Sequence, residues 1–315
     1  MALWIPNQLA VKGAKDAFME RIDNIPEVWR NYATITDSTT ATETYAFANA
    51  VPEPRVMTGE RHIQGVGDVN FTVTNDTHEL SLMVQREAFE DDQVSAINAR
   101  FRELAEVYAT YKDSLFTALL EAGSTTDALM DSDSFFEDDR TIGSSGTINN
   151  DLTAAAAAGN AVPTASELLI QLAIWKAAML GFMDDKGRPF NVLASTKMRL
   201  AVMPAAEYVA RAALTANFIP IVAADGATDN IFKGMAELDV LPYHTASSTT
   251  NTMYLAMLGS DRKPILYQQR TPLEIIIDTT PESVAERNAI LVLCRERFKM
   301  TYGDPRRMLK FIWTT

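Results

Sequence analysis

Cysteine, histidine and long apolar runs are scarce in this chain, and each scarcity excludes a class of protein. Among 315 residues there are one cysteine, Cys294, and three histidines. A lone cysteine forms no intrachain disulfide and no cysteine-based metal cluster, and it favours a reducing cytoplasm. No stretch approaches the roughly 18 uncharged apolar residues of a membrane span, and the start, Met-Ala-Leu-Trp-Ile-Pro, lacks the basic flank of a secretory signal. We therefore expect no membrane partner.

The usual signatures of catalysis and cofactor binding are also missing. No two of His62, His78 and His244 are three or four residues apart, so no helical zinc pair occurs. No Gly-Lys-Ser follows the glycines at 65 and 67, which excludes a phosphate loop. Cys294 lies in an apolar run typical of a buried strand, where a structural thiol is expected. We expect no catalytic residue, no cofactor, no metal and no enzyme activity.

Two acidic clusters in the sequence are candidate metal sites. They are Glu87, Glu90, Asp91 and Asp92, and Glu137, Asp138 and Asp139. Neither has the Asp-x-Asp-x-Asp-Gly spacing of a calcium loop. Helix capping explains the first cluster, and the second is expected to be a solvated loop.

Net charge and hydrophobic content set the broad class. The formal net charge is −13, and 47% of the residues are hydrophobic, which is enough to build a core. A dedicated nucleic-acid binder needs clustered lysine and arginine to displace counterions, so we expect no sequence-specific DNA binding. The charge does not exclude a protein shell that encloses DNA, because an acidic or neutral inner wall would let packed DNA slide. Solubility alone is an alternative explanation of the charge.

A long hydrophilic stretch with a strand pattern, residues 38–92, leads into one regular helix. Residues 69–73 and 80–84 alternate apolar and polar side chains, as a half-exposed sheet does, and Asn75-Asp76 between them predicts a hairpin turn. The stretch has too few large apolar residues to fold alone, so we expect an arm that lies on neighbouring subunits. The helix after it carries an apolar seam for about six turns. The seam residues are Val94, Ile97, Phe101, Leu104, Tyr108, Tyr111 and Leu115.

The rest of the chain is expected to contain both helices and short apolar strands. Thr164-Ala-Ser-Glu167 is a capping box and opens a helix that ends near Gly181. A second helix is expected over residues 204–215, and a loose segment over residues 123–162. Strands are expected at residues 200–203, 218–222, 237–241, 254–258, 273–277, 289–298 and 309–313.

Several residues would contribute little stability to a monomer, or would be costly to expose in one, and are candidates for contacts between subunits. Apolar groups near a free terminus are costly to expose, although a short helix is expected there at about residues 11–21. Arginine beside glutamate in a loop fixes register across a subunit boundary. The candidates are Trp4 and Trp29 near the start, Glu53, Arg55, Glu60 and Arg61 in the loop, and Phe135 and Phe136 in the loose segment.

Five short motifs follow one another along the chain. They are Thr44-Tyr-Ala-Phe47, Gly59-Glu-Arg61, Arg86-Glu-Ala-Phe-Glu-Asp-Asp92, Ser134-Phe-Phe136 and Asp184-Asp-Lys-Gly-Arg-Pro189. With the order of arm, extended loop, long helix and α/β region, they resemble the major capsid proteins of tailed phages, which have the Hong Kong 97-like fold. The resemblance therefore implies an α+β fold class. Within that class the chain is most similar to the Mu-like prophage major head subunit family.

The resemblance implies a division of the chain and a set of partners. The parts are an N-terminal arm (1–34), an extended loop with peripheral-domain strands (35–90), a spine helix with peripheral domain (91–164), an axial domain (165–262) and C-terminal core strands (263–315). Copies would form hexamers and pentamers of an icosahedral virion capsid around double-stranded DNA, assembled in the bacterial host cytoplasm. A separate scaffolding protein and a portal are implied, and a decoration protein is left open.

Two further expectations concern assembly. Because the arm begins at Met1, we expect no fused scaffold domain. Lysine is absent between Lys15 and Lys112, and arginine stays protonated and is a very poor nucleophile. We therefore expect non-covalent loop and arm contacts, with no isopeptide cross-links from the extended loop.

Two alternative functions stay open from the sequence. An encapsulin-type nanocompartment shares the fold but encloses an enzyme cargo, and a cargo-binding pocket on the inner wall would distinguish it. A small-molecule enzyme with an α/β domain at residues 165–260 is more remote, since the sequence offers no convergent nucleophile, base and metal set.

Overall fold

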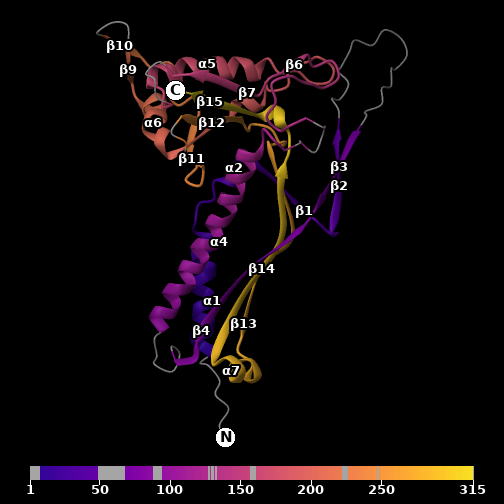
Figure 1. Ribbon diagram of the computed structural model, residues 1–315, viewed down its shortest axis with the longest axis vertical. Helices are drawn as coiled ribbons and strands as arrows, with labels where there is room; N and C mark the ends of the chain where they lie inside the picture. The colour runs from indigo at the N-terminus through magenta and orange to yellow at the C-terminus, as the bar shows by residue number, and fades with distance from the viewer. Residues whose placement is uncertain are drawn as a thin grey trace.

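Two sheets lie at different levels of an elongated molecule (Figure 1). The computed structural model describes residues 8–48, 68–87, 94–126, 128, 131, 133–156, 161–221, 226–245, 247 and 249–314. A five-stranded sheet with two helices forms the upper part of the view, and a four-stranded sheet beside a long helix forms the lower part. The predicted α+β class is confirmed.

The four-stranded sheet pairs strands from the first third of the sequence with strands from the last third. Its strands, in spatial order, are β1 (Ala33–Asp37), β13 (Ile265–Asp278), β14 (Ala289–Tyr302) and β4 (Asp76–Gln85). β1 is parallel to β13, and the other neighbours are antiparallel. A short helix, α7 (Pro281–Arg287), connects β13 to β14 and ends at Asn288, whose φ of 48° is a left-handed conformation that asparagine tolerates.

Two helices cover one face of this sheet. The long helix α4 (Val94–Ala122) packs with α1 (Gln8–Asp23), and both predicted helices are confirmed. Phe18 and Phe101 form an apolar core with inward-facing residues of β4, β13 and β14. The seam differs at one position, because Tyr111 is 38% exposed while Lys112 is buried. The four-residue step from Tyr108 to Lys112 follows the 3.6-residue period of the helix.

The five-stranded sheet holds the largest apolar core. Its strands, in spatial order, are β11 (Glu237–Val240), β8 (Met198–Val202), β12 (Thr250–Met257), β15 (Met308–Thr314) and β7 (Asp151–Ala155). Helices α5 (Ala165–Leu180) and α6 (Glu207–Thr215) pack with it. The capping box at the start of α5 is present: the Thr164 side chain accepts a hydrogen bond from the Glu167 amide, and the Glu167 carboxylate accepts one from the Thr164 amide. Trp175 of α5 packs on Phe311 of β15 with ring centroids 4.5 Å apart.

Two expectations about strands are wrong. The turn at Asn75-Asp76 does not join a hairpin: β3 (Asp68–Thr74) pairs with β2 (Thr42–Ala48), whereas β4 pairs with β14. The segment over residues 123–162 is not loose throughout, because β7 pairs in parallel with β15. An alternating pattern predicts that a strand exists and which face it buries, but its partner lies far away in sequence.

The remaining elements are short. They are α2 (Trp29–Tyr32), the pair β5 (Arg140–Thr141) and β6 (Thr147–Ile148), and the pair β9 (Phe218–Ile221) and β10 (Gly226–Asp229). The expected strand at 218–222 is thus β9. Within the described part of the chain, no helix is both long and apolar enough to cross a membrane.

Candidate assembly surfaces

Strands β2 and β3 form an arm that leaves the four-stranded sheet at its middle (Figure 1). β1 lies on one edge of the sheet and β4 on the opposite edge. β1 ends and β4 begins at the same row of cross-strand partners, formed by Asp37, Gln269, Phe298 and Asp76. From this row the chain passes from β1 into β2, and it returns from β3 into β4. The arm is therefore anchored at both edges of one sheet.

The arm has little support of its own. Within the described residues, β2 and β3 pair only with each other. Tyr45 and Phe71 stack across the pair with ring centroids 5.5 Å apart. An isolated two-stranded sheet is marginal in water, and its outer edges present unpaired backbone groups to other chains. An arm of this kind is stabilised when it lies on another surface.

Five of the predicted contact residues lie outside the described residues. Trp4 precedes α1, and Glu53, Arg55, Glu60 and Arg61 lie in the sequence between β2 and β3, as does His62. Their part in subunit contacts stays a prediction.

The other three predicted contact residues, Trp29, Phe135 and Phe136, are buried inside the chain, with at most 2% of each exposed. Trp29 packs on Tyr267 with ring centroids 4.3 Å apart, and Phe135 stacks on Tyr302 at 4.6 Å. All three belong to one apolar core. Their interpretation as surface contacts is therefore corrected: in this structure they stabilise the subunit from within.

The acidic neighbours of the phenylalanine pair suggested an exposed loop, but its main chain is anchored inward. The Phe136 amide donates to the Gly123 carbonyl at 2.8 Å, and the Asn150 side-chain amide donates to the Phe135 carbonyl at 3.0 Å. A Cβ at Gly123 would lie 2.6 Å from the Phe136 ring, so the glycine permits this close approach. The acids that follow remain at the surface.

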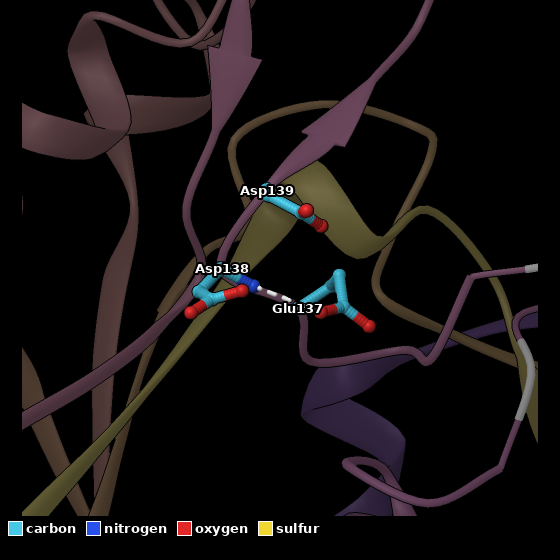
Figure 2. Close-up of side chains that lie close together, drawn as sticks. All are labelled: Glu137, Asp138 and Asp139. Atoms are coloured by element: carbon cyan, nitrogen blue, oxygen red, sulfur yellow. Dashed lines mark hydrogen bonds between the residues drawn. The ribbon is translucent and has the colours of Figure 1, made fainter.

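These acids form the one group of three potential metal-ligating side chains found among the described residues (Figure 2). The ligand oxygens of Glu137, Asp138 and Asp139 all lie within 4.8 Å of one another. The Asp138 amide donates to the Glu137 carboxylate at 3.3 Å. Asp138 and Asp139 are exposed, and exposed carboxylates are screened by water and salt. The group is a solvated turn, and we assign no metal to it.

Apolar side chains gather on the face of the four-stranded sheet opposite α1 and α4. Met83 of β4 is 53% exposed and Ile276 of β13 is 58% exposed. Leu291 is the cross-strand partner of Met83, and Leu293 is the partner of Ile276. We call these four residues the sheet patch. Leu291 and Leu293 are half-buried between the two exposed side chains. Apolar groups that lie side by side at a surface are typical of an interaction site.

A second set of exposed apolar residues lies at the five-stranded end of the molecule. Tyr208 of α6 is 84% exposed, Phe218 of β9 is 63% exposed, and Ile231 is 83% exposed. Phe218 is the first residue of β9, and Ile231 follows β10 by two residues. The β9–β10 pair projects from the corner of the molecule in Figure 1. Two separate regions of the subunit thus present large apolar groups to solvent.

An ion pair between α4 and β14 is buried in the subunit core. The Lys112 ammonium lies 3.0 Å from the Glu296 carboxylate, and neither side chain is more than 8% exposed. The hydroxyls of Tyr108 and Tyr267 donate to the same carboxylate. Burial, together with the hydrogen bond to Glu296, raises the pKa of Tyr108 above its ordinary value. The network joins α4 to β13 and β14 and withdraws the Lys112 amine from solvent.

The described histidines and the cysteine have structural surroundings. His78 Nδ1 lies 3.0 Å from the Tyr111 hydroxyl, and burial lowers the pKa of His78. His244 Nδ1 lies 3.2 Å from the Glu121 carboxylate. Cys294 is buried, and its burial raises the pKa of the thiol to about 11, which keeps it protonated and unreactive at neutral pH. The prediction of a structural thiol is confirmed.

An arm on a sheet, a long helix beside it and an α/β end together form the architecture of phage capsid proteins. Over 98% of its length the chain is similar to a chain of the procapsid of bacteriophage JBD30, with 17% sequence identity, a TM-score of 0.55 and 74% of that chain covered. At this identity the likeness establishes the fold alone. It is the Hong Kong 97-like capsid fold.

Sequence comparison then identifies the family. Residues 8–170 match the family described as Mu-like prophage major head subunit gpT, and the chain belongs to it. The FluMu major head subunit of Haemophilus influenzae is 28% identical over 126 residues, which are 40% of this chain and 41% of that protein. The major capsid protein of Escherichia phage Mu is 27% identical over 120 residues, 38% of this chain and 39% of that protein. The chain thus spans about two fifths of each relative. Head subunits are structural proteins, so this family is not one of enzymes.

Proposed function

We propose that this chain is the major head subunit of a tailed bacteriophage or prophage. Copies of it assemble into hexamers and pentamers that close an icosahedral shell around double-stranded DNA. Membership of the head subunit family is the observation that carries the proposal. The arm and the sheet patch support it, because both become more stable when a second molecule covers them. Obligate interfaces typically bury about 2,000 Å² or more.

The proposed parts of the subunit follow its elements. The spine helix is α4, the extended loop includes β2 and β3, and the axial domain at residues 165–262 contains α5, α6 and the strands from β8 to β12. The spine helix and the four-stranded sheet form the body from which the arm reaches a neighbour. The axial domain, with its exposed Tyr208, Phe218 and Ile231, meets its copies around the centre of each capsomer.

The proposed partners follow from the shell. A separate scaffolding protein sets its size, a portal occupies one vertex, and assembly takes place in the bacterial cytoplasm. The DNA inside is held without sequence recognition, since a net charge of −13 leaves no excess of cations to bind phosphates. A nanocompartment that encloses an enzyme is the alternative with the same fold. The match to head subunits favours the phage shell.

Shortening the arm tests the proposal. Replacement of residues 52–66 by a two-residue Gly-Ser linker should leave the subunit folded, with unchanged circular dichroism and melting temperature, because the sequence of this segment has too few large apolar residues to build a core. The same variant should form no closed shells in electron micrographs. A control that replaces the segment by fifteen Gly and Ser residues keeps its length and separates reach from side-chain contacts. Regular particles from the shortened variant would contradict assembly through the arm.

A further inference from the structure

We propose that Gln268 and Asn75 are positioning residues that set the angle at which the β2–β3 arm leaves the sheet, and through that angle the curvature of the shell. The second part rests on the proposed function, whereas the first concerns the subunit itself. The inference comes from a polar cluster at the base of the arm, in which Ser38, Asn75 and Gln268 are buried and the other two members are half-buried. We call it the root cluster: Ser38, Glu43, Tyr45, Asn75 and Gln268.

Gln268 lies in the sheet directly under the arm. Its neighbours in β13, Tyr267 and Gln269, both point to Glu296 in the helix-side core, with side-chain hydrogen bonds of 2.9 and 3.3 Å. Because side chains alternate along a strand, Gln268 points to the face opposite α4. Among the described helices, α1 and α4 pack on the other face of the sheet, yet the Gln268 side chain is fully buried. The base of the arm therefore covers it.

The Gln268 amide contacts both strands of the arm. Its Nε2 donates to Asn75 Oδ1 at 2.8 Å, just beyond the end of β3, and lies 3.5 Å from the Val73 carbonyl. Its Oε1 accepts a hydrogen bond from the Tyr45 hydroxyl of β2 at 2.7 Å. One side chain of the sheet thus fixes β2 and β3 relative to β13.

Asn75 links the two places where the arm joins the sheet. Its Nδ2 donates to Ser38 Oγ at 3.0 Å, to the Thr40 carbonyl at 3.1 Å and to the Ala41 carbonyl at 3.3 Å. Its backbone amide donates to the Ala41 carbonyl at 3.0 Å. With only 8% of Asn75 exposed, breaking these bonds would leave buried polar groups without partners.

Glu43 stiffens the turn between β1 and β2. Its Oε1 accepts hydrogen bonds from the backbone amides of Thr39 at 2.7 Å and Thr40 at 2.9 Å, and from the Ser38 hydroxyl at 3.1 Å. The bonds from Thr40 and Thr39 lower the pKa of Glu43 to about 2, so the carboxylate is ionised at neutral pH. These bonds fix the conformation of the turn at residues 38–41, which holds the acceptor atoms for the Asn75 side chain.

The nature of these contacts indicates positioning. None of the described residues of β2 or β3 belongs to the three apolar cores of the subunit. Burial of apolar surface is non-directional, whereas hydrogen bonds depend steeply on distance and angle. An arm that is joined to its sheet through a hydrogen-bonded cluster has one preferred direction. In a closed shell the direction of each arm sets where the next subunit lies.

The test compares Gln268→Met with Gln269→Met. Both replace an amide by a side chain of nearly the same length in the same strand. The Gln268 side chain bonds to the arm, whereas the Gln269 side chain bonds to Glu296 on the other face. We expect Gln268→Met to raise amide hydrogen exchange at residues 38–45 and 70–75 of the unassembled subunit by about tenfold or more. In assembly it should give open sheets or a broad range of shell diameters. Gln269→Met should leave the exchange of the arm and the shell diameter unchanged.

Two results would overturn the inference. One is a Gln268→Met shell with the same narrow diameter distribution as the native shell, and the other is equal effects of both variants, which would mean general destabilisation. Should Gln268→Met fail to fold, Tyr45→Phe removes only the hydroxyl bond to Gln268 and must loosen the same amides. If native subunits form no shells at all, the proposed function fails, while the exchange data still decide the role of the root cluster.

Discussion

At the scale of single residues, buried polar groups join the parts of this subunit to one another. The Lys112–Glu296 pair connects the spine helix to the sheet, and Gln268 connects the sheet to the arm. Each group is buried with its partners in place, which avoids the cost of an unpaired polar atom in the core. Removing one partner is therefore expected to cost more than the interaction itself contributes.

Lys112→Met should lower the free energy of unfolding by about 3–5 kcal/mol, because it leaves the Glu296 carboxylate buried without its cation. Urea unfolding followed by fluorescence measures the change. Lys299→Met is the matched control: Lys299 pairs with Asp76 at 2.8 Å, but both side chains are at least 40% exposed, so the loss should stay below about 1 kcal/mol. Equal losses for the two variants would contradict the role of the buried pair.

Residue-level expectations were limited by what hydrophobicity alone can predict. Hydrophobicity favours Tyr111 over Lys112 as the buried residue of the seam, although the helical spacing from Tyr108 allows either residue to be buried. A lysine is buried only when a carboxylate meets it, and Glu296 is 184 residues away in sequence. The same limit applied to Phe135 and Phe136, whose acidic neighbours suggested a surface loop. Cys294 was predicted correctly because the five residues before it in the sequence, 289–293, are all apolar.

At the scale of elements, helices were predictable and strand partners were not. The spine helix follows from its spacing, and α5 follows from its capping box; both signals are local in sequence. The pairing of β3 with β2, in place of β4, cannot be predicted from the turn at Asn75. The hydrogen bond that Asn75 makes there comes from Gln268, 193 residues away in sequence. The sheet patch likewise became visible only once β4, β13 and β14 lay side by side.

Ile276→Lys tests the sheet patch as an interface. Because Ile276 is 58% exposed, the substitution should change the free energy of unfolding by no more than about 0.5 kcal/mol. A charge placed in a covered apolar interface has no partner, so the yield of shells should fall about tenfold or more. Ile276→Val keeps the surface apolar and should assemble normally. Normal shell yield from Ile276→Lys, measured by sedimentation, would show that this patch faces solvent.

At the scale of the whole molecule, the subunit is a body with an arm, and we propose that its contacts with neighbours are non-covalent. The structure strengthens the argument against cross-links from the loop. Lysine is absent between Lys15 and Lys112, Lys112 is buried against Glu296, and Lys15 lies on α1. Amide bond formation needs a free amine as nucleophile, and the arm does not supply one.

Denaturing gel electrophoresis of mature particles should therefore show a single band near the monomer mass of 34.8 kDa. Boiling in detergent separates subunits that are held by apolar contacts and hydrogen bonds, but it leaves amide bonds intact. Purified unassembled subunit, run beside the particles, provides the reference band. A ladder of covalent oligomers with a loop residue at the linkage, located by mass spectrometry, would be the opposite result.

Electron microscopy of the expressed chain tests the central claim most directly. The chain should be produced in bacteria with and without the scaffolding protein of the same phage or prophage. With the scaffolding protein, the account predicts hollow icosahedral shells of one diameter, and without it, particles of mixed size. Only monomers or small oligomers under both conditions would contradict the conclusion that this chain is a capsid subunit.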